Sequence, residues 1–267
     1  MVNKIAIHSV PRSGSTWLGE IFNSAPSVKY CYQPLFSYAL KGALTPEMSK
    51  DVADRFFEAC QTTEDDFILQ SEARESGKLP QFDKASHADH VVYKEVRYHH
   101  ILPRLIEVDA SVKLVLLIRS PLSVVSSWLR APKEFRAEWD VATEWRAAPS
   151  KNAGKPEEFN GFEKWLEATR MFHDLQVQAP ERVTLVKYRD LLMSPEAEAE
   201  RLFGFTGLPF GKETRDFLES STGKHNPDHY SVFRSKQSDD KWRSQLDPAI
   251  AEEIISETKS AGFEDYL

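Results

Sequence analysis

The run Val112 to Ile118 is the feature that most restricts the fold of this chain. Its residues are almost all apolar, and Arg119 and the pair Ser120-Pro121 follow at once. An apolar run of this length is typical of a strand that is covered on both faces in a parallel sheet. Serine followed by proline is a common start of a helix. The segment therefore predicts an inner strand whose carboxyl end lies at Arg119.

Short apolar strands and amphipathic helices alternate along the rest of the chain. Further strands are predicted over residues 4–9, 91–94 and 183–186. Helices are predicted over residues 16–24, 50–62, 100–108, 162–178 and 248–259, with shorter ones from residues 190 and 195. This alternation implies an α/β fold with a central parallel sheet flanked by helices. The polar stretches 131–160 and 220–240 lack periodicity, so we expect long loops there, which often bind ligands.

Length and composition favour a single globular domain over residues 1–267, with insertions near residues 40–90 and 131–160. No apolar run approaches the roughly 20 residues that span a bilayer, and no secretory signal follows the start. Two cysteines are too few for a disulfide framework and favour a cytoplasmic location. The net charge of −7 argues against nucleic-acid binding. An anionic ligand must therefore be held by a local cluster of positive groups.

The loop Pro11-Arg12-Ser13-Gly14-Ser15-Thr16 joins the first predicted strand to the first predicted helix. Gly14 allows a tight turn and a close approach of the backbone to a ligand. The free N–H groups and the dipole at the helix start favour an anion, and Arg12 adds a guanidinium that binds oxyanions. Hydroxyl donors come from Ser13, Ser15 and Thr16. The loop therefore predicts an anion site, with an ordinary serine-rich helix cap as the alternative.

This loop differs from the nucleotide P-loop, Gly-x4-Gly-Lys-Ser/Thr. Counted from Gly14, Ser15 stands at the lysine position and Ser9 at the first glycine. The strand that ends at Ile118 is followed by Arg119 and not by an aspartate that could hold magnesium. A nucleotide-dependent phosphotransferase is therefore the weaker interpretation, and no metal is expected.

A second motif runs from Arg119 to Ser127. Arg119 stands at the carboxyl end of the central strand, where α/β sheets bind ligands. Ser127 lies about two turns into the next helix, on the face that can return toward the same ligand. The two residues therefore predict one phosphate site, with a salt bridge and an unrelated helix serine as the alternative.

These two motifs resemble those of the sulfotransferases that use 3′-phosphoadenosine 5′-phosphosulfate (PAPS). Pro11 to Leu18 is similar to the family's 5′-phosphosulfate loop, with Arg12 where many cytosolic members have lysine and carbohydrate sulfotransferases commonly have arginine. Arg119 and Ser127 are similar to its 3′-phosphate motif. The resemblance implies a P-loop-like nucleotide-binding fold, PAPS as co-substrate and 3′-phosphoadenosine 5′-phosphate (PAP) as product. It implies cofactor binding by the loop residues Arg12, Ser13, Gly14, Ser15, Thr16 and Trp17.

Other segments resemble parts of the same family. Tyr188, in Lys187-Tyr188-Arg189-Asp190-Leu191, is implied to lie near the adenine. Arg234, Ser235 and Lys236 resemble a basic loop that closes over the 3′-phosphate. Gln33-Pro34-Leu35-Phe36 and Lys94-Glu95-Val96-Arg97 resemble short motifs of the carbohydrate sulfotransferases and imply acceptor binding by Gln33, Lys94 and Arg97. The implied reaction moves a sulfuryl group to a hydroxyl of a sugar, glycolipid or other small alcohol, with Arg12 beside the leaving oxygen.

The general base is where the sequence departs from this family. Cytosolic members have histidine at the position of Val96, and several carbohydrate and glycolipid members have glutamate at the position of Gln33. Neither residue here accepts a proton. The candidates near Lys94 in sequence are Glu95, His99 and His100, of which His99 is preferred. A nucleotide-binding relative that has lost catalysis is the remaining alternative.

Overall fold

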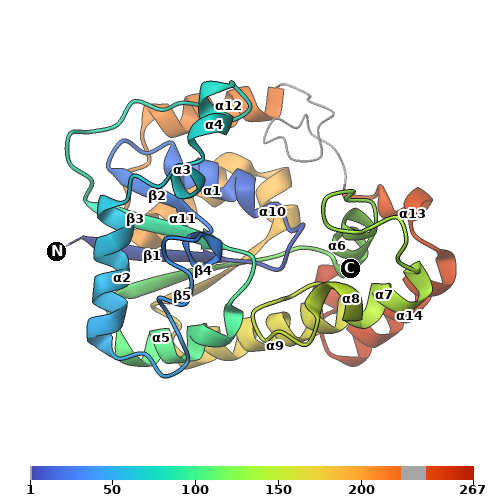
Figure 1. Cartoon of the computed structure of the whole chain (residues 1–267). Helices are drawn as coiled ribbons and strands as arrows, with labels where there is room; N and C mark the ends of the chain where they lie inside the picture. The colour runs from blue at the N-terminus through green and yellow to red at the C-terminus, as the bar shows by residue number, and fades with distance from the viewer. Residues whose placement is uncertain (1, 224–238) are drawn as a thin grey trace.

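Five parallel strands form one sheet in the order β2-β3-β1-β4-β5 in the computed structural model, which describes residues 2–223 and 239–267 (Figure 1). The strands are β1 (Asn3–His8), β2 (Val28–Tyr32), β3 (His90–Glu95), β4 (Val112–Ile118) and β5 (Val183–Lys187). Every pairing within the sheet is parallel. The predicted fold class, a parallel sheet flanked by helices, is confirmed. The prediction of a single domain over residues 1–267 stays a prediction.

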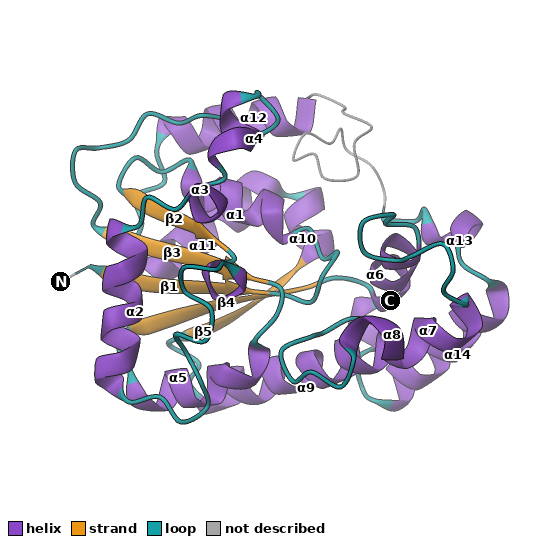
Figure 2. Ribbon diagram, in the orientation of Figure 1, coloured by secondary structure: helices purple, strands orange, loops and turns teal. Residues whose placement is uncertain are grey.

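Helices cover both faces of the sheet, and each face has its own hydrophobic core (Figure 2). On β1, Ile5 and Ile7 enter one core and Ala6 enters the other, because successive side chains of a strand point to opposite faces. The core of Ile5 and Ile7 includes residues of α1 (Ser15–Asn23), α11 (Pro195–Thr206) and α12 (Lys212–Gly223). The core of Ala6 includes residues of α2 (Lys50–Thr62), α5 (Leu102–Val108), α6 (Pro121–Leu129), α9 (Phe162–Gln178) and α14 (Pro248–Ser260).

The remaining elements are short. They are α3 (Asp66–Leu69), α4 (Ser71–Glu75), α7 (Val141–Ala147), α8 (Pro149–Asn152), α10 (Tyr188–Met193), α13 (Trp242–Gln245), and the 3₁₀ turns η1 (Pro34–Phe36), η2 (His99–Ile101) and η3 (Glu264–Tyr266). Of these, α7 and α8 lie in the stretch 131–160, which therefore is not a plain loop. The side chain of Asp140 caps α7 by accepting a hydrogen bond from the N–H of Ala142 at 3.1 Å.

Most predicted elements are confirmed within one or two residues, and β4, α2 and α9 match their predicted ranges. The edge strand β2 is not among the predicted strands, because its buried and half-buried positions form no continuous apolar run. Helix α12 is also unpredicted, and it carries residues 220–223 of the second expected loop. Residues 224–238 of that loop lie outside the described residues. Ser120 is the N-cap of α6, as predicted, but its side chain makes no capping hydrogen bond.

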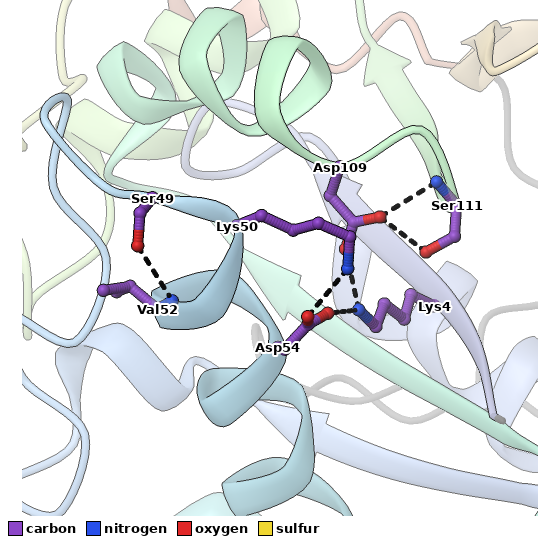
Figure 3. A network of polar contacts seen from close by, with 7 residues as sticks. All are labelled: Lys4, Ser49, Lys50, Val52, Asp54, Asp109 and Ser111. Carbon is purple, nitrogen blue, oxygen red and sulfur yellow. Dashed lines mark hydrogen bonds and ion pairs between the residues drawn. The ribbon is translucent and has the colours of Figure 1, made fainter.

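An ion-pair network fastens the sheet to α2 at the amino end of β1 (Figure 3). Lys4 on β1 donates to Asp109 at 2.7 Å and also to Asp54 of α2. Lys50 donates to the same Asp54 at 2.7 Å. The network lies at the opposite end of β1 from the loop that follows its carboxyl end, which is the end at which parallel sheets bind ligands.

No helix in residues 2–223 or 239–267 is both long and apolar enough to cross a membrane.

Candidate active site

The loop after β1 turns sharply around Gly14. Arg12 and Gly14 both have positive φ, at 70° and 88°, which costs little only for glycine. A Cβ on Gly14 would lie 2.4 Å from Cε2 of Tyr188. Glycine is therefore required twice here, for its backbone conformation and for the close approach of the Tyr188 ring.

The start of α1 presents open backbone donors to a cavity. Gly14, Ser15, Thr16 and Trp17 all line this cavity. The N–H groups of Ser15 and Thr16 donate to no residue in the described part of the chain, which is normal for the first turn of a helix. Trp17 is held by its indole N–H, which donates to Ser221 Oγ at 3.1 Å. Donors and dipole together make the first turn of α1 suited to a phosphate or sulfate.

Ser13 does not line this cavity. It is fully buried, and its hydroxyl has no hydrogen-bond partner among the described residues. Its backbone therefore belongs to the anion loop, whereas its side chain is turned away from the cavity.

Arg119 lies beside the loop that leads into α1 and joins the two predicted motifs. Its Nη1 donates to the carbonyl oxygen of Arg12 at 2.7 Å. Its Nε donates to both carboxylate oxygens of Asp239, at 3.0 and 3.1 Å. Its guanidinium carbon lies 4.7 Å from the centre of the Tyr188 ring. Burial opposes the charge of Arg119, but Asp239 raises its pKa, so the guanidinium stays protonated.

Ser127 binds Arg12, so the second motif meets the first through this side chain also. Arg12 Nε donates to Ser127 Oγ at 3.1 Å, and Arg12 Nη1 donates to Glu134 Oε1 at 3.3 Å. Arg12, Arg119 and Ser127 all line the same cavity. The structure therefore brings together the two segments that the sequence separates by more than a hundred residues.

Gln33 and Arg97 form a second wall of the cavity. Gln33 follows β2 with a positive φ of 42°, and its Oε1 accepts a hydrogen bond from Arg97 Nη1 at 3.1 Å. Arg97 also pairs with Glu158 at 3.0 Å and stacks over the Phe36 ring at 4.3 Å. Gln33 and Arg97, two of the three residues predicted to bind the acceptor, are thus held in place by contacts between distant parts of the chain.

Lys94 lines the cavity although its side chain is only 1% exposed. Its Nζ lies 4.1 Å from the centre of the Tyr32 ring. Burial lowers the pKa of Lys94 to about 7, and Glu95 opposes that shift. Val96 lines the cavity two residues further on. A lysine that is taken out of water in this way can bind an anion strongly or exchange a proton near neutral pH.

The structure does not bring Glu95 or His99 to this cavity. Glu95 points to the opposite face of β3 from Lys94 and accepts a hydrogen bond from the N–H of Leu35 at 2.8 Å. His99 is fully buried on that same face, 3.0 Å from His8 and packed against Phe159. Burial lowers the pKa of His99 well below its usual value. Neither residue is therefore placed to take a proton from an acceptor in the cavity.

His100 does not line the cavity either.

The cavity has a volume of about 340 Å³ and is strongly cationic. Six of its lining residues are basic: Arg12, Lys94, Arg97, Arg119, Lys133 and Lys151. Among the described lining residues, Glu134 is the single acidic one. The chain is acidic as a whole, so it can bind an anion only at a local cluster of positive groups. The cavity provides such a cluster.

Eight lining residues are absent from the predicted site: Pro11, Tyr32, Phe36, Val96, Lys133, Glu134, Lys151 and Leu192. Three of them come from the stretch 131–160, and its lack of periodicity was the available signal for a binding segment. The predicted residues Arg234, Ser235 and Lys236 lie outside the described residues. In the described part of the chain, no group of three or more His, Cys, Asp and Glu side chains could hold a metal ion.

Comparison with known proteins points to one family. A model of the sulfotransferase family matches residues 4–212. Carbohydrate sulfotransferase 3 of Tetronarce californica is 27% identical over 173 residues, which cover 61% of this chain and 38% of that protein. The mouse protein of the same name is 23% identical, with 62% and 36% covered. The chain thus spans less than two fifths of the length of these relatives.

Solved structures show the same fold. The sulfotransferase domain of the Synechococcus PCC 7002 olefin synthase has a TM-score of 0.57 at 20% identity, with 97% of this chain and 95% of that one covered. Mouse sulfotransferase SULT7A1, complexed with PAP, has a TM-score of 0.54 at 12% identity, with 99% and 89% covered. The family model spans well over half of the chain, and the fold agrees with it. The chain therefore belongs to the sulfotransferase family.

Proposed function

We propose that this protein transfers a sulfuryl group from PAPS to a hydroxyl of a sugar, glycolipid or other small alcohol. The observation that carries the proposal is the convergence of the first turn of α1, Arg12 and Arg119 on one cationic cavity. A doubly anionic nucleotide needs two separate sets of donors. The family match and the resemblance of both motifs to the PAPS motifs of sulfotransferases support the same donor.

The proposed donor site uses both motifs. The backbone N–H groups of residues 13–16 hold the 5′-phosphosulfate, and Arg119 with Ser127 holds the 3′-phosphate. Tyr188 and Trp17 flank the adenine, which agrees with their position in the lining of the cavity. Arg234, Ser235 and Lys236 stay predicted contacts of the 3′-phosphate.

The proposed chemistry depends on position and charge. An attacking hydroxyl, the sulfur and the bridging oxygen of PAPS lie in line, as in phosphoryl transfer. Negative charge builds on the bridging oxygen as its bond to sulfur breaks, and Arg12 stabilises that charge. Removal of one such donor costs about 10²–10³ in rate. No metal takes part in this scheme.

Gln33, Lys94 and Arg97 are proposed to bind the acceptor. The Gln33–Arg97 pair offers amide and guanidinium donors that suit hydroxyl groups. Relatives at 22–27% identity are named carbohydrate sulfotransferases, which supports a carbohydrate acceptor. The cytoplasmic location stays a prediction.

Calorimetric titration with PAP tests the donor site. Arg119→Ala is expected to weaken PAP binding about 10- to 150-fold, since a hydrogen bond to a charged group contributes about 1.5–3 kcal/mol. Ser127→Ala is expected to weaken it less. Arg215→Ala is the matched control, because Arg215 is outside the cavity lining, where it pairs with the exposed Glu196 and lies over the Phe210 ring. This variant should bind PAP as the wild type does. Unchanged binding in Arg119→Ala would remove the second motif from the site.

Two other outcomes would identify the alternatives. Magnesium-dependent ATP turnover would indicate a phosphotransferase. Ser15 argues against this function, because it stands where the nucleotide P-loop has lysine. PAP binding without transfer from PAPS to any acceptor would indicate an inactive relative, in line with Gln33 and Val96.

A further inference from the structure

Glu134 is the one carboxylate that the described residues contribute to the lining of the cavity, and none of them contributes a histidine. The two positions that carry a proton acceptor in related enzymes hold Gln33 and Val96 here, and both line the cavity. A transfer to an alcohol nevertheless needs a group that removes the hydroxyl proton. Glu134 is therefore the first residue to consider for that task.

The position of Glu134 is tied to the reacting end of the proposed donor. Its Oε1 lies 3.3 Å from Nη1 of Arg12, the residue proposed to stabilise the leaving oxygen. Its backbone N–H donates to the carbonyl oxygen of Ala131 at 2.8 Å, which anchors the turn that carries it. Its side chain is 22% exposed, so a carboxylate at this place is reached by solvent as well as by a ligand.

Charged and polar groups from several parts of the chain surround Glu134. Arg12 faces it from the loop after β1, Lys94 interacts with it from β3, and Tyr32 interacts with it from β2. Lys133 and Lys151 line the same cavity. Three separate elements thus present cations or a phenol to one carboxylate.

We propose that Glu134 is the general base of the transfer, an inference that rests on the proposed function. The acceptor oxygen forms a bond to the sulfur of PAPS while its proton passes to a carboxylate oxygen of Glu134. The bond from sulfur to the bridging oxygen breaks, and its electron pair stays on that oxygen, which becomes part of the 5′-phosphate of PAP beside Arg12. Glu134 then gives its proton to water.

The test compares Glu134→Gln with the wild type on two acceptors. Transfer from PAPS to 4-nitrophenyl β-D-glucoside, whose hydroxyls are un-ionised, is expected to fall about 10²–10⁴-fold. Transfer to 4-nitrophenol at a pH at which it is already ionised should change little, because no proton has to be removed. If neither acceptor reacts, the rate of PAPS hydrolysis is compared between the two proteins instead, with water as the un-ionised acceptor.

A pH profile separates a base from a merely structural residue. The wild-type rate should fall on the acid side as the base is protonated, and this acid limb should be lost in Glu134→Gln and return in part in Glu134→Asp. Glu138→Gln is the matched control, because Glu138 lies in the same segment, is exposed and pairs only weakly with Arg136, at 3.8 Å. It should behave as the wild type.

Several results would overturn the inference. Equal losses on both acceptors, or a matching loss of PAP affinity, would show that Glu134 only positions Arg12. Loss of the acid limb in Lys94→Met instead of Glu134→Gln would make the lysine the base. If the wild type binds PAP and turns PAPS over, and Glu134→Gln keeps its rate, Glu134 is excluded and the proposed function stands. If the wild type neither transfers nor hydrolyses PAPS, both fail.

Discussion

The proposed donor side and the proposed acceptor side of the cavity are built differently. On the proposed donor side, Gly14 lies in the loop after β1 and Arg119 follows directly on β4. The groups proposed to contact the ligand there include backbone N–H groups and the guanidinium of Arg119. On the acceptor side, Gln33, Arg97 and Glu158 meet from three distant segments, and the contacts are side chains. The donor side thus depends on local chain geometry, whereas the acceptor side depends on how remote segments pack.

Arg12 contacts both Ser127 and Glu134. Its loss should have the largest effect, because Arg12 is proposed to stabilise the charge on the leaving oxygen. Arg12→Ala is expected to slow transfer from PAPS about 10²–10³-fold. Arg12→Lys should recover much of the rate, because it restores a positive charge at the position where related enzymes carry lysine. Single-turnover measurements with PAPS check both variants. If Arg12→Ala keeps the wild-type rate, Arg12 has no part in the chemistry.

Gly14 tests the claim that the donor side is set by the backbone. Gly14→Ala is expected to lower PAP affinity about tenfold, because the new Cβ would lie 2.4 Å from Tyr188 and force that ring to move. Gly42→Ala is the matched control: φ is +74° there also, but no atom lies within 4 Å of the added Cβ. Titration with PAP should show the loss in Gly14→Ala and none in Gly42→Ala, since Gly42 does not line the cavity. Equal losses would mean that the close approach of Tyr188 does not matter.

Lys94 tests whether the proposed acceptor side holds an amine that has been taken out of water. Burial lowers its pKa from 10.5 to about 7, so between these values the unfolded chain binds a proton that the folded chain does not. Stability therefore decreases as the pH falls from about 10.5 to about 7, with a slope of up to about 1.4 kcal/mol per pH unit. Chemical denaturation across this range should show that slope in the wild type and lack it in Lys94→Met. Parallel curves would mean that Lys94 is charged and solvated in the folded protein.

Replacement of Asp239 should have the smallest effect, and it should strengthen PAP binding instead of weakening it. Its carboxylate accepts two hydrogen bonds from Nε of Arg119, the donor proposed for the 3′-phosphate. Asp239→Asn should bind PAP about fivefold more tightly, the equivalent of about 1 kcal/mol for a lost competing ion pair. Weaker PAP binding in this variant would show instead that Asp239 holds Arg119 in its binding geometry.

The prediction of the general base shows where reasoning along the chain fails. His99 lies five residues after Lys94, which places it near the site in sequence. The strand ends at Glu95, and a turn with positive φ at Tyr98 carries the chain on to His99, which packs in the core on the far side of the sheet. Nearness along the chain says nothing about which face a residue reaches once a strand has ended. For Glu134 the sequence gives only the expectation that the stretch 131–160 binds a ligand, and no local pattern singles out this residue.

Four of the five strands, the parallel sheet and the anion loop after β1 could be predicted from the sequence alone, because each rests on periodicity or on residues that are adjacent in the chain. The tertiary structure decided the acceptor side. The bonds from Arg12 to Glu134 and from Gln33 to Arg97 join residues that are 122 and 64 positions apart. Such contacts exist only after the sheet has brought its loops to one edge, and local patterns carry no information about them.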